Sequence, residues 1–173
     1  TASTALIAAG SGAGADGKLK VAATGAVTLG LLNDVGTLGA SVSDAAAVFT
    51  YNDIDALTLD RITTDGVLTG ASLGALPSGA TNALTTNGGA VTLTTGNTLT
   101  VSKAIVTTPS AANAIGGSVS LNAATGGIST GAAGAITTTG AVSDGVGGTA
   151  GAGGVVLVYA QAGAVLLGED ITA

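Results

Sequence analysis

The chain has 173 residues, room for one domain, and combines 30 glycines with only two Tyr and one Phe. Its 46% hydrophobic and 8% charged content is the reverse of a disordered composition. A net charge of −6, with four basic residues, excludes the basic surface that nucleic acids or anionic membranes require. We therefore expect no nucleic-acid binding. Because no apolar run approaches the roughly 20 residues of a membrane span, we also expect no membrane insertion.

Short apolar runs bounded by Gly, Asn or Asp recur along the chain, and their apolar side chains stand at alternate positions. Such alternation predicts β-strands. Frequent Gly disfavours long helices, and the best helical candidate, 43–49, is short. In chain order, the strand-rich runs are GKLKVAATGAVTLG from Gly17, DALTLDRITTDGVLTG at 55–70, GAVTLTTGNTLTV from Gly89, GSVSLNAATGGIST from Gly117 and GVVLVYAQAGAVLLG from Gly154. The sequence therefore predicts an all-β chain.

Four of these runs share one pattern: Gly, any residue, an aliphatic residue, any residue and a second aliphatic residue. Their first glycines, Gly17, Gly89, Gly117 and Gly154, lie 72, 28 and 37 residues apart. Repeated strand–turn–strand units that cannot bury a face alone are typical of stacked repeats. We predict one β-solenoid domain over 1–173, with about eight or nine coils at roughly 20 residues each. A less regular acidic segment is expected at about 31–54.

The pattern also assigns faces and corners to individual residues. Since successive strand residues point to opposite faces, one alternate set faces the core. Corners call for Gly or Asn where φ is positive, which Gly126–Gly127 and Asn87–Gly89 would supply. We predict corners at Gly89, Gly117 and Gly154, and inward positions at Val91, Leu93, Val119, Leu121, Val155, Leu157, Val165 and Leu167.

The runs GGSVSLNAATGGISTG, GGAVTLTTGNTLTV and GVVLVYAQAGAVLLGEDITA resemble the repeats of filamentous-haemagglutinin-type exoproteins. The resemblance covers most of the chain from Gly17 to Ala173 and is weakest at 31–54. It implies a right-handed parallel β-helix belonging to the shaft of a large bacterial surface or secreted protein, of the kind exported by two-partner secretion. The amino-terminal secretion domain of that family has no counterpart here.

The early segment GAGADG, 12–17, matches a dinucleotide-binding pattern, with Asp34 17 residues further on. Gly12 to Lys18 also fits most of a phosphate-binding loop, but Leu19 stands where Ser or Thr is needed. Both motifs act at the start of a helix, whereas the residues after Lys18 have a strand pattern. We interpret this segment as a glycine-rich corner and predict no cofactor.

Six of the ten acidic residues fall between positions 34 and 65. Asp53 and Asp55 stand two apart, so one strand face could carry both and begin a site for a hard cation such as calcium. Neither an EF-hand spacing nor a calcium-binding nonapeptide repeat is present. A solvated acidic loop is the main interpretation, with structural calcium kept as the alternative.

Catalytic groups are sparse. The chain has no Cys and no His, and only Asp60 and Arg61 bring opposite charges together locally. Adjacent strand residues point to opposite faces, so this pair does not form a solenoid lyase or glycosidase site by itself. We expect no enzyme, and a polysaccharide-processing activity is the least favoured alternative.

Threonines suggest another alternative, an ice-binding or glycan-binding solenoid face. Thr-x-Thr occurs at 92–94, 98–100 and 137–139. From the sequence, these do not recur at one place in successive coils, and many Thr serve as β-branched strand formers. This function therefore ranks second.

Neither end of the sequence has a polar or helical cap, and both ends have strand-like patterns. A solenoid without caps exposes unpaired strand edges. We expect the partner to be the chain itself, through end-to-end stacking, or adjoining repeats of a longer chain. The sequence favours a structural element of an extracellular or cell-surface filament, sheath or adhesin.

Overall fold

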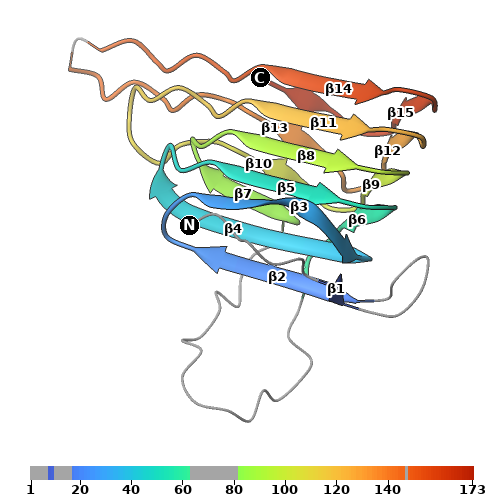
Figure 1. The fold of residues 1–173 in the computed structure, drawn as a ribbon. Helices are drawn as coiled ribbons and strands as arrows, with labels where there is room; N and C mark the ends of the chain where they lie inside the picture. Colours follow the sequence, from blue (N-terminus) through green and yellow to red (C-terminus); the bar gives the residue numbers. More distant parts are fainter. Residues whose placement is uncertain (1–7, 10–16, 63–81, 147) are drawn as a thin grey trace, which may run out of the picture.

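The computed structural model describes residues 8–9, 17–62, 82–146 and 148–173 (Figure 1). These ranges contain β-strands and no helix, and hence no helix that could cross a membrane. The strands are β1 (Ala8–Ala9), β2 (Lys18–Ala23), β3 (Val27–Val35), β4 (Thr37–Ala45), β5 (Phe49–Asp53), β6 (Leu57–Leu59), β7 (Leu84–Asn87), β8 (Val91–Thr95), β9 (Leu99–Val101), β10 (Ile105–Val106), β11 (Val119–Ala123), β12 (Ile128–Thr130), β13 (Ile136–Thr137), β14 (Val156–Ala160), β15 (Val165–Leu167) and β16 (Ile171–Thr172). The predicted all-β class is confirmed.

The strands form two sheets in which every pairing is parallel. The first sheet has the order β1-β3-β5-β8-β11-β14. In the second sheet, β4 pairs with β2 on one side and with both β6 and β7 on the other. From there the sheet continues as two columns, β6-β9-β12-β15 and β7-β10-β13-β16. Figure 1 shows the strands of each column lying one above another.

The chain passes from the first sheet to the second and back again in each layer of the stack. We call β1 and β2 the first layer and β14, β15 and β16 the last layer. The six strands of the first sheet correspond to six layers among the described residues, fewer than the expected eight or nine. Equivalent residues Val27, Phe49, Val91, Val119 and Val156 are separated by 22, 42, 28 and 37 residues, so most layers use more chain than the assumed 20. This order of parallel strands is consistent with a β-solenoid.

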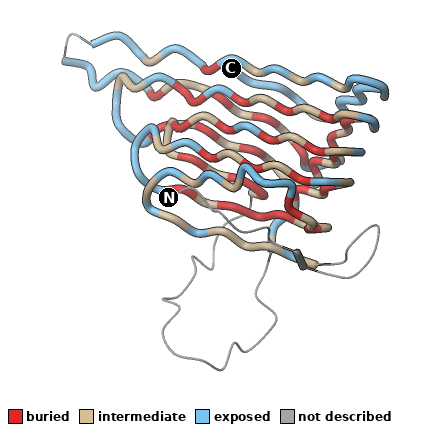
Figure 2. Tube along the Cα trace, in the orientation of Figure 1, coloured by how far each residue is buried: buried red, intermediate tan, exposed pale blue. Residues whose placement is uncertain are grey.

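The core lies between the two sheets, where buried residues gather (Figure 2), and consists of aliphatic side chains together with Phe49 and Tyr51. Val91 stacks on Val119, and Leu93 stacks on Leu121. All four side chains are buried, as the sequence predicted. Each removes apolar surface from water, worth roughly 1.5–3 kcal/mol for a side chain of this size. Alternation thus identified the inward face correctly in β8 and β11.

Two of the residues predicted to face the core point outward instead. Val155 is 71% exposed and Leu157 57% exposed, while the residues paired with Val119 and Leu121 are Val156 and Val158. Five consecutive apolar residues, VVLVY, carry no alternation of their own, and only the pattern counted from Gly154 aligns Val156 and Val158 with Val119 and Leu121. The register is set by stacking on β11, where the Val119 N–H donates to the Val155 carbonyl at 2.8 Å.

The glycines that open the first-sheet strands β8, β11 and β14 have a different physical role from the one expected. Gly117 lies directly over Gly89, and Gly154 over Gly117, so closely that an added Cβ would overlap the backbone of the glycine below. Their φ angles are not positive, and neither are those of Gly126 and Gly127, where backbone proximity again leaves no room for a Cβ. Among the predicted corner glycines, Gly88 does adopt a positive φ, of 75°. Close approach of stacked backbones therefore selects most of these glycines.

Buried threonines close the corner that leads back to the first sheet. In three successive layers a fully buried Thr hydroxyl donates to the carbonyl of the glycine that opens the next first-sheet strand. The Thr107 hydroxyl reaches the Gly117 carbonyl at 2.5 Å across ten residues. The pairs are Thr86 with Gly89, Thr107 with Gly117 and Thr138 with Gly154. The same Thr-to-Gly hydrogen bond thus closes corners in which the two residues are 3, 10 and 16 positions apart in the chain.

The segment at 31–54 holds the end of β3, all of β4 and the whole of β5. Two register shifts interrupt its pairing, between Leu29 and Asn33 and between Val42 and Ala45. The helical candidate at 43–49 is not a helix: it spans the end of β4, the corner at 46–48, where Ala46 adopts a φ of 56°, and the first residue of β5. Apart from Gly36, the corner at 46–48 and Ile54, this segment lies in strands, although its ladder is the most disturbed part of the described stack.

Candidate functional site

The last layer presents an open edge of main-chain groups. Its three strands pair only with the layer below: β14 with β11, β15 with β12 and β16 with β13. Within the stack, the Ile128 N–H donates upward to the Ala164 carbonyl at 2.9 Å, and the Ile136 N–H to the Asp170 carbonyl at 3.1 Å. By register, the equivalent N–H groups belong to Val165 and Ile171. No strand of the described chain lies above them.

The side chains of the last layer continue the core columns without a cover. Val165 and Leu167 lie in register with the buried Ile128 and Thr130, so their predicted inward positions are correct. They are nevertheless 41% and 44% exposed, and Ile171 is 41% exposed. In Figure 2 this layer is mainly exposed or intermediate, whereas buried residues dominate the middle layers. Apolar side chains and unpaired strand groups together make this edge the strongest candidate for an assembly surface.

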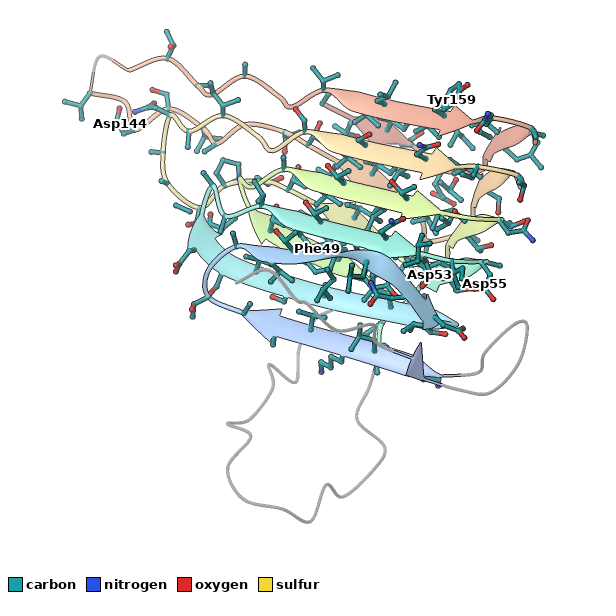
Figure 3. All side chains as sticks on the ribbon, in the orientation of Figure 1. Phe49, Asp53, Asp55, Asp144 and Tyr159 are labelled. Atoms are coloured by element: carbon teal, nitrogen blue, oxygen red, sulfur yellow. The ribbon has the colours of Figure 1, made fainter. Side chains whose placement is uncertain are left out.

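The two acids proposed as the start of a cation site lie together at the end of β5 (Figure 3). Asp53 is fully buried in the interior row, and Asp55 follows the strand. The Tyr51 hydroxyl donates to Asp53 Oδ2 at 2.7 Å, and the Asp55 N–H donates to Asp53 Oδ1 at 3.2 Å. Both carboxylate oxygens thus already have protein donors. Within the described part of the chain, no group of three or more His, Cys, Asp or Glu side chains could hold a metal ion.

Burial changes the acidity of Asp53 and of the Tyr51 hydroxyl that donates to it. Desolvation raises the pKa of Asp53 to about 6, and the donated bonds from Tyr51 and Asp55 offset only part of that rise. Burial and the neighbouring Asp53 carboxylate also raise the pKa of the Tyr51 hydroxyl. The expectation of a solvated acidic loop is therefore wrong for Asp53: alternation from Phe49 and Tyr51 places it at the interior position that Thr95 and Ala123 occupy in the layers above.

The remaining charged motifs form no site among the described residues. Gly12 to Asp16, the core of the proposed glycine motif, lies outside them, and the motif's last residues, Gly17 and Lys18, lead into strand β2 rather than a helix. Asp34 lies in β3. At Asp60 and Arg61 the contact is local: the Arg61 backbone N–H donates to Asp60 Oδ1 at 2.6 Å.

The outer face of the first sheet carries a row of hydroxyl side chains. Thr28, Thr50, Thr92 and Ser120 stand in register on four consecutive strands, β3, β5, β8 and β11. The three Thr-x-Thr segments fall in separate columns, at β8, β9 and β13, as expected; the row instead joins Thr92 to hydroxyl residues outside these segments. The layers are separated by 22, 42 and 28 residues, so no fixed period in the sequence reveals the alignment.

A search among protein-family models, curated proteins and solved structures found no match to this chain.

Proposed function

We propose that the chain is a right-handed parallel β-solenoid that serves as a structural building block of a filament, sheath or adhesin shaft outside the cell or on its surface. The open last layer is the observation that carries the proposal. Right-handedness follows from the rule that crossovers between parallel strands of one sheet are right-handed in about 98% of cases. The repeats that resemble filamentous-haemagglutinin-type exoproteins agree with this role.

Assembly follows from the chemistry of the open edge. A parallel strand laid on β14, β15 or β16 would satisfy the exposed N–H and C=O groups and cover Val165, Leu167 and Ile171. The next layer comes either from a second copy or from adjoining repeats of a longer polypeptide. Because the contact joins two different ends, repetition gives an open fibre rather than a closed ring. The chain acts in this proposal by stacking and not by turnover.

Electron microscopy of the purified chain tests this proposal directly. We expect fibres whose axial repeat matches the height of one stack of layers, six in the described residues. Val165→Lys should abolish the fibres, because a second copy would bury the new charge in the core column. Leu166→Lys is the matched control: Leu166 is 65% exposed on the outer face of the same strand, so its variant should still assemble. Compact monodisperse particles of the unmodified chain at every concentration would rule the proposal out, as would equal assembly of both variants.

A second candidate function is binding of ice or of a glycan by the hydroxyl row. The alignment of Thr28, Thr50, Thr92 and Ser120 at the strand spacing of about 4.8 Å favours it. On this reading the protein shows thermal hysteresis or glycan retention, and Thr50→Val with Thr92→Val removes most of the effect. Thr85→Val with Thr137→Val, in the β7 column, is the control and leaves it unchanged. Absence of both activities in the unmodified protein eliminates this candidate.

A further inference from the structure

The two ends of the second sheet carry matching apolar side chains in the same two columns. One column runs from Leu19 through Leu38 and the layers above to Leu167. The other runs from Val21 through Ala40 to Ile171. Leu19 and Val21 are half-buried in β2, which pairs only with β4 among the described strands. A copy seated with its β2 on β15 and β16 would continue both columns with aliphatic contacts.

The residues between these two columns carry opposite charges at the two ends of the stack. In β2, Lys20 stands between Leu19 and Val21, at the corner of the sheet where the layer above has Gly39. In the last layer, the same corner between Leu167 and Ile171 is made by Gly168, Glu169 and Asp170. Glu169 is half-buried and Asp170 exposed.

The charge asymmetry holds for the whole of strand β2 compared with the last layer, and not for single residues alone. Two of the four basic residues of the chain, Lys18 and Lys20, lie in β2, which contains no acid. The last layer from Val156 to Thr172 contains two acids and no basic residue. A head-to-tail contact thus sets opposite charges one strand spacing apart, whereas a contact between two last layers sets four acids against one another. Such complementarity selects orientation and register more than it adds affinity.

We propose that the partner of the last layer is a second copy of this chain, seated with β2 on β15 and β16 so that Lys20 faces Glu169 and Asp170. The inference rests on the proposed end-to-end assembly and specifies its polarity and register. In every junction of the resulting fibre, Leu19 covers Leu167 and Val21 covers Ile171. Figure 1 shows β2 at one end of the stack and β15 at the other, as such a junction requires.

Reciprocal charge reversal tests the junction. Lys20→Glu alone sets acid against acid, and Glu169→Lys with Asp170→Lys sets base against base. We expect each variant alone to raise the concentration needed for fibre formation about tenfold at low salt, measured by sedimentation and electron microscopy. In an equimolar mixture of the two variants every junction again joins opposite charges, so assembly should return to within about threefold of the unmodified chain.

Lys103→Glu is the matched control, because Lys103 lies at the same corner of the sheet between β9 and β10, inside the stack. Its reversal changes the net charge as Lys20→Glu does and should leave assembly unchanged. An unmodified chain that stays monomeric overturns both the assembly proposal and this junction. Fibres that form equally well from each reversed variant alone, or a mixture that assembles no better than its components, overturn the junction only.

Discussion

Gly117→Ala will destabilise the fold by about 3 kcal/mol, measured as the free energy of unfolding in urea with far-UV circular dichroism. The added Cβ would overlap the carbonyl of Gly89 and the adjacent backbone, and no flexible side chain is there to yield. Relief requires the two layers to separate at this corner. That movement strains the bond from the Gly117 N–H to the Thr107 carbonyl, 3.1 Å, and the Thr107 hydroxyl bond back to Gly117.

Gly25→Ala provides the control for this prediction. Gly25 lies in the turn between β2 and β3, where an added Cβ meets no heavy atom within 4 Å and φ is not positive. We expect its free energy of unfolding to stay within about 0.5 kcal/mol of the unmodified chain. Similar stabilities for Gly117→Ala and Gly25→Ala would show that backbone contact between layers does not select the corner glycines.

Stability will fall as the pH rises from about 4 to above 6, through the titration of Asp53. The folded pKa is about 6 and the ordinary value is 3.8, so the folded chain holds this proton more tightly than the unfolded chain. Stability from the protonated form is therefore fully present below 3.8 and is lost as the pH passes through 6. The difference between the folded and the ordinary pKa corresponds to on the order of 3 kcal/mol of folding free energy. About half of this contribution is lost between pH 5 and pH 8.

Asp53→Asn isolates this contribution from that of the other acids. The amide keeps an oxygen for the Asp55 N–H and a polar group beside the Tyr51 hydroxyl, but it does not ionise. We expect the variant to gain about 1.5 kcal/mol on the unmodified chain between pH 5 and pH 8, measured by urea unfolding at both values. Asp44→Asn, at an exposed position, should show no such gain. A pH dependence that is identical in the Asp53→Asn variant and the unmodified chain would contradict the assignment.

Much of the architecture follows from local sequence features. Alternation predicts the strands and, where only one face is apolar, the inward residues, as Val91, Leu93, Val119 and Leu121 confirm. The spacing of Gly89, Gly117 and Gly154 matches the spacing of three successive layers, because each glycine marks the same corner. The sequence predicts these features because alternate burial in a strand and close backbone contact at a corner each depend on the residue types of one short segment.

Other features depend on which residues the stack places above one another. VVLVY is apolar on both faces, so its own alternation leaves the inward set open; the distance from Gly154 and the pairing with β11 both select Val156 and Val158. Layers of 22, 42, 28 and 37 residues conceal the hydroxyl row and the true number of layers, since loops of variable length can join strands of constant register.

Composition and local periodicity are enough to identify this chain as all-β, repetitive and poor in groups for catalysis or for nucleic-acid binding. The tertiary structure was needed to show that Asp53 is fully buried, and that Lys20 and Glu169 stand at the same corner of opposite ends. Both depend on parallel strand pairing, which lays Thr95 over Asp53 and carries the corner of Lys20 through the stack to Glu169. Pairing fixes register in space and leaves the length of the connecting chain free.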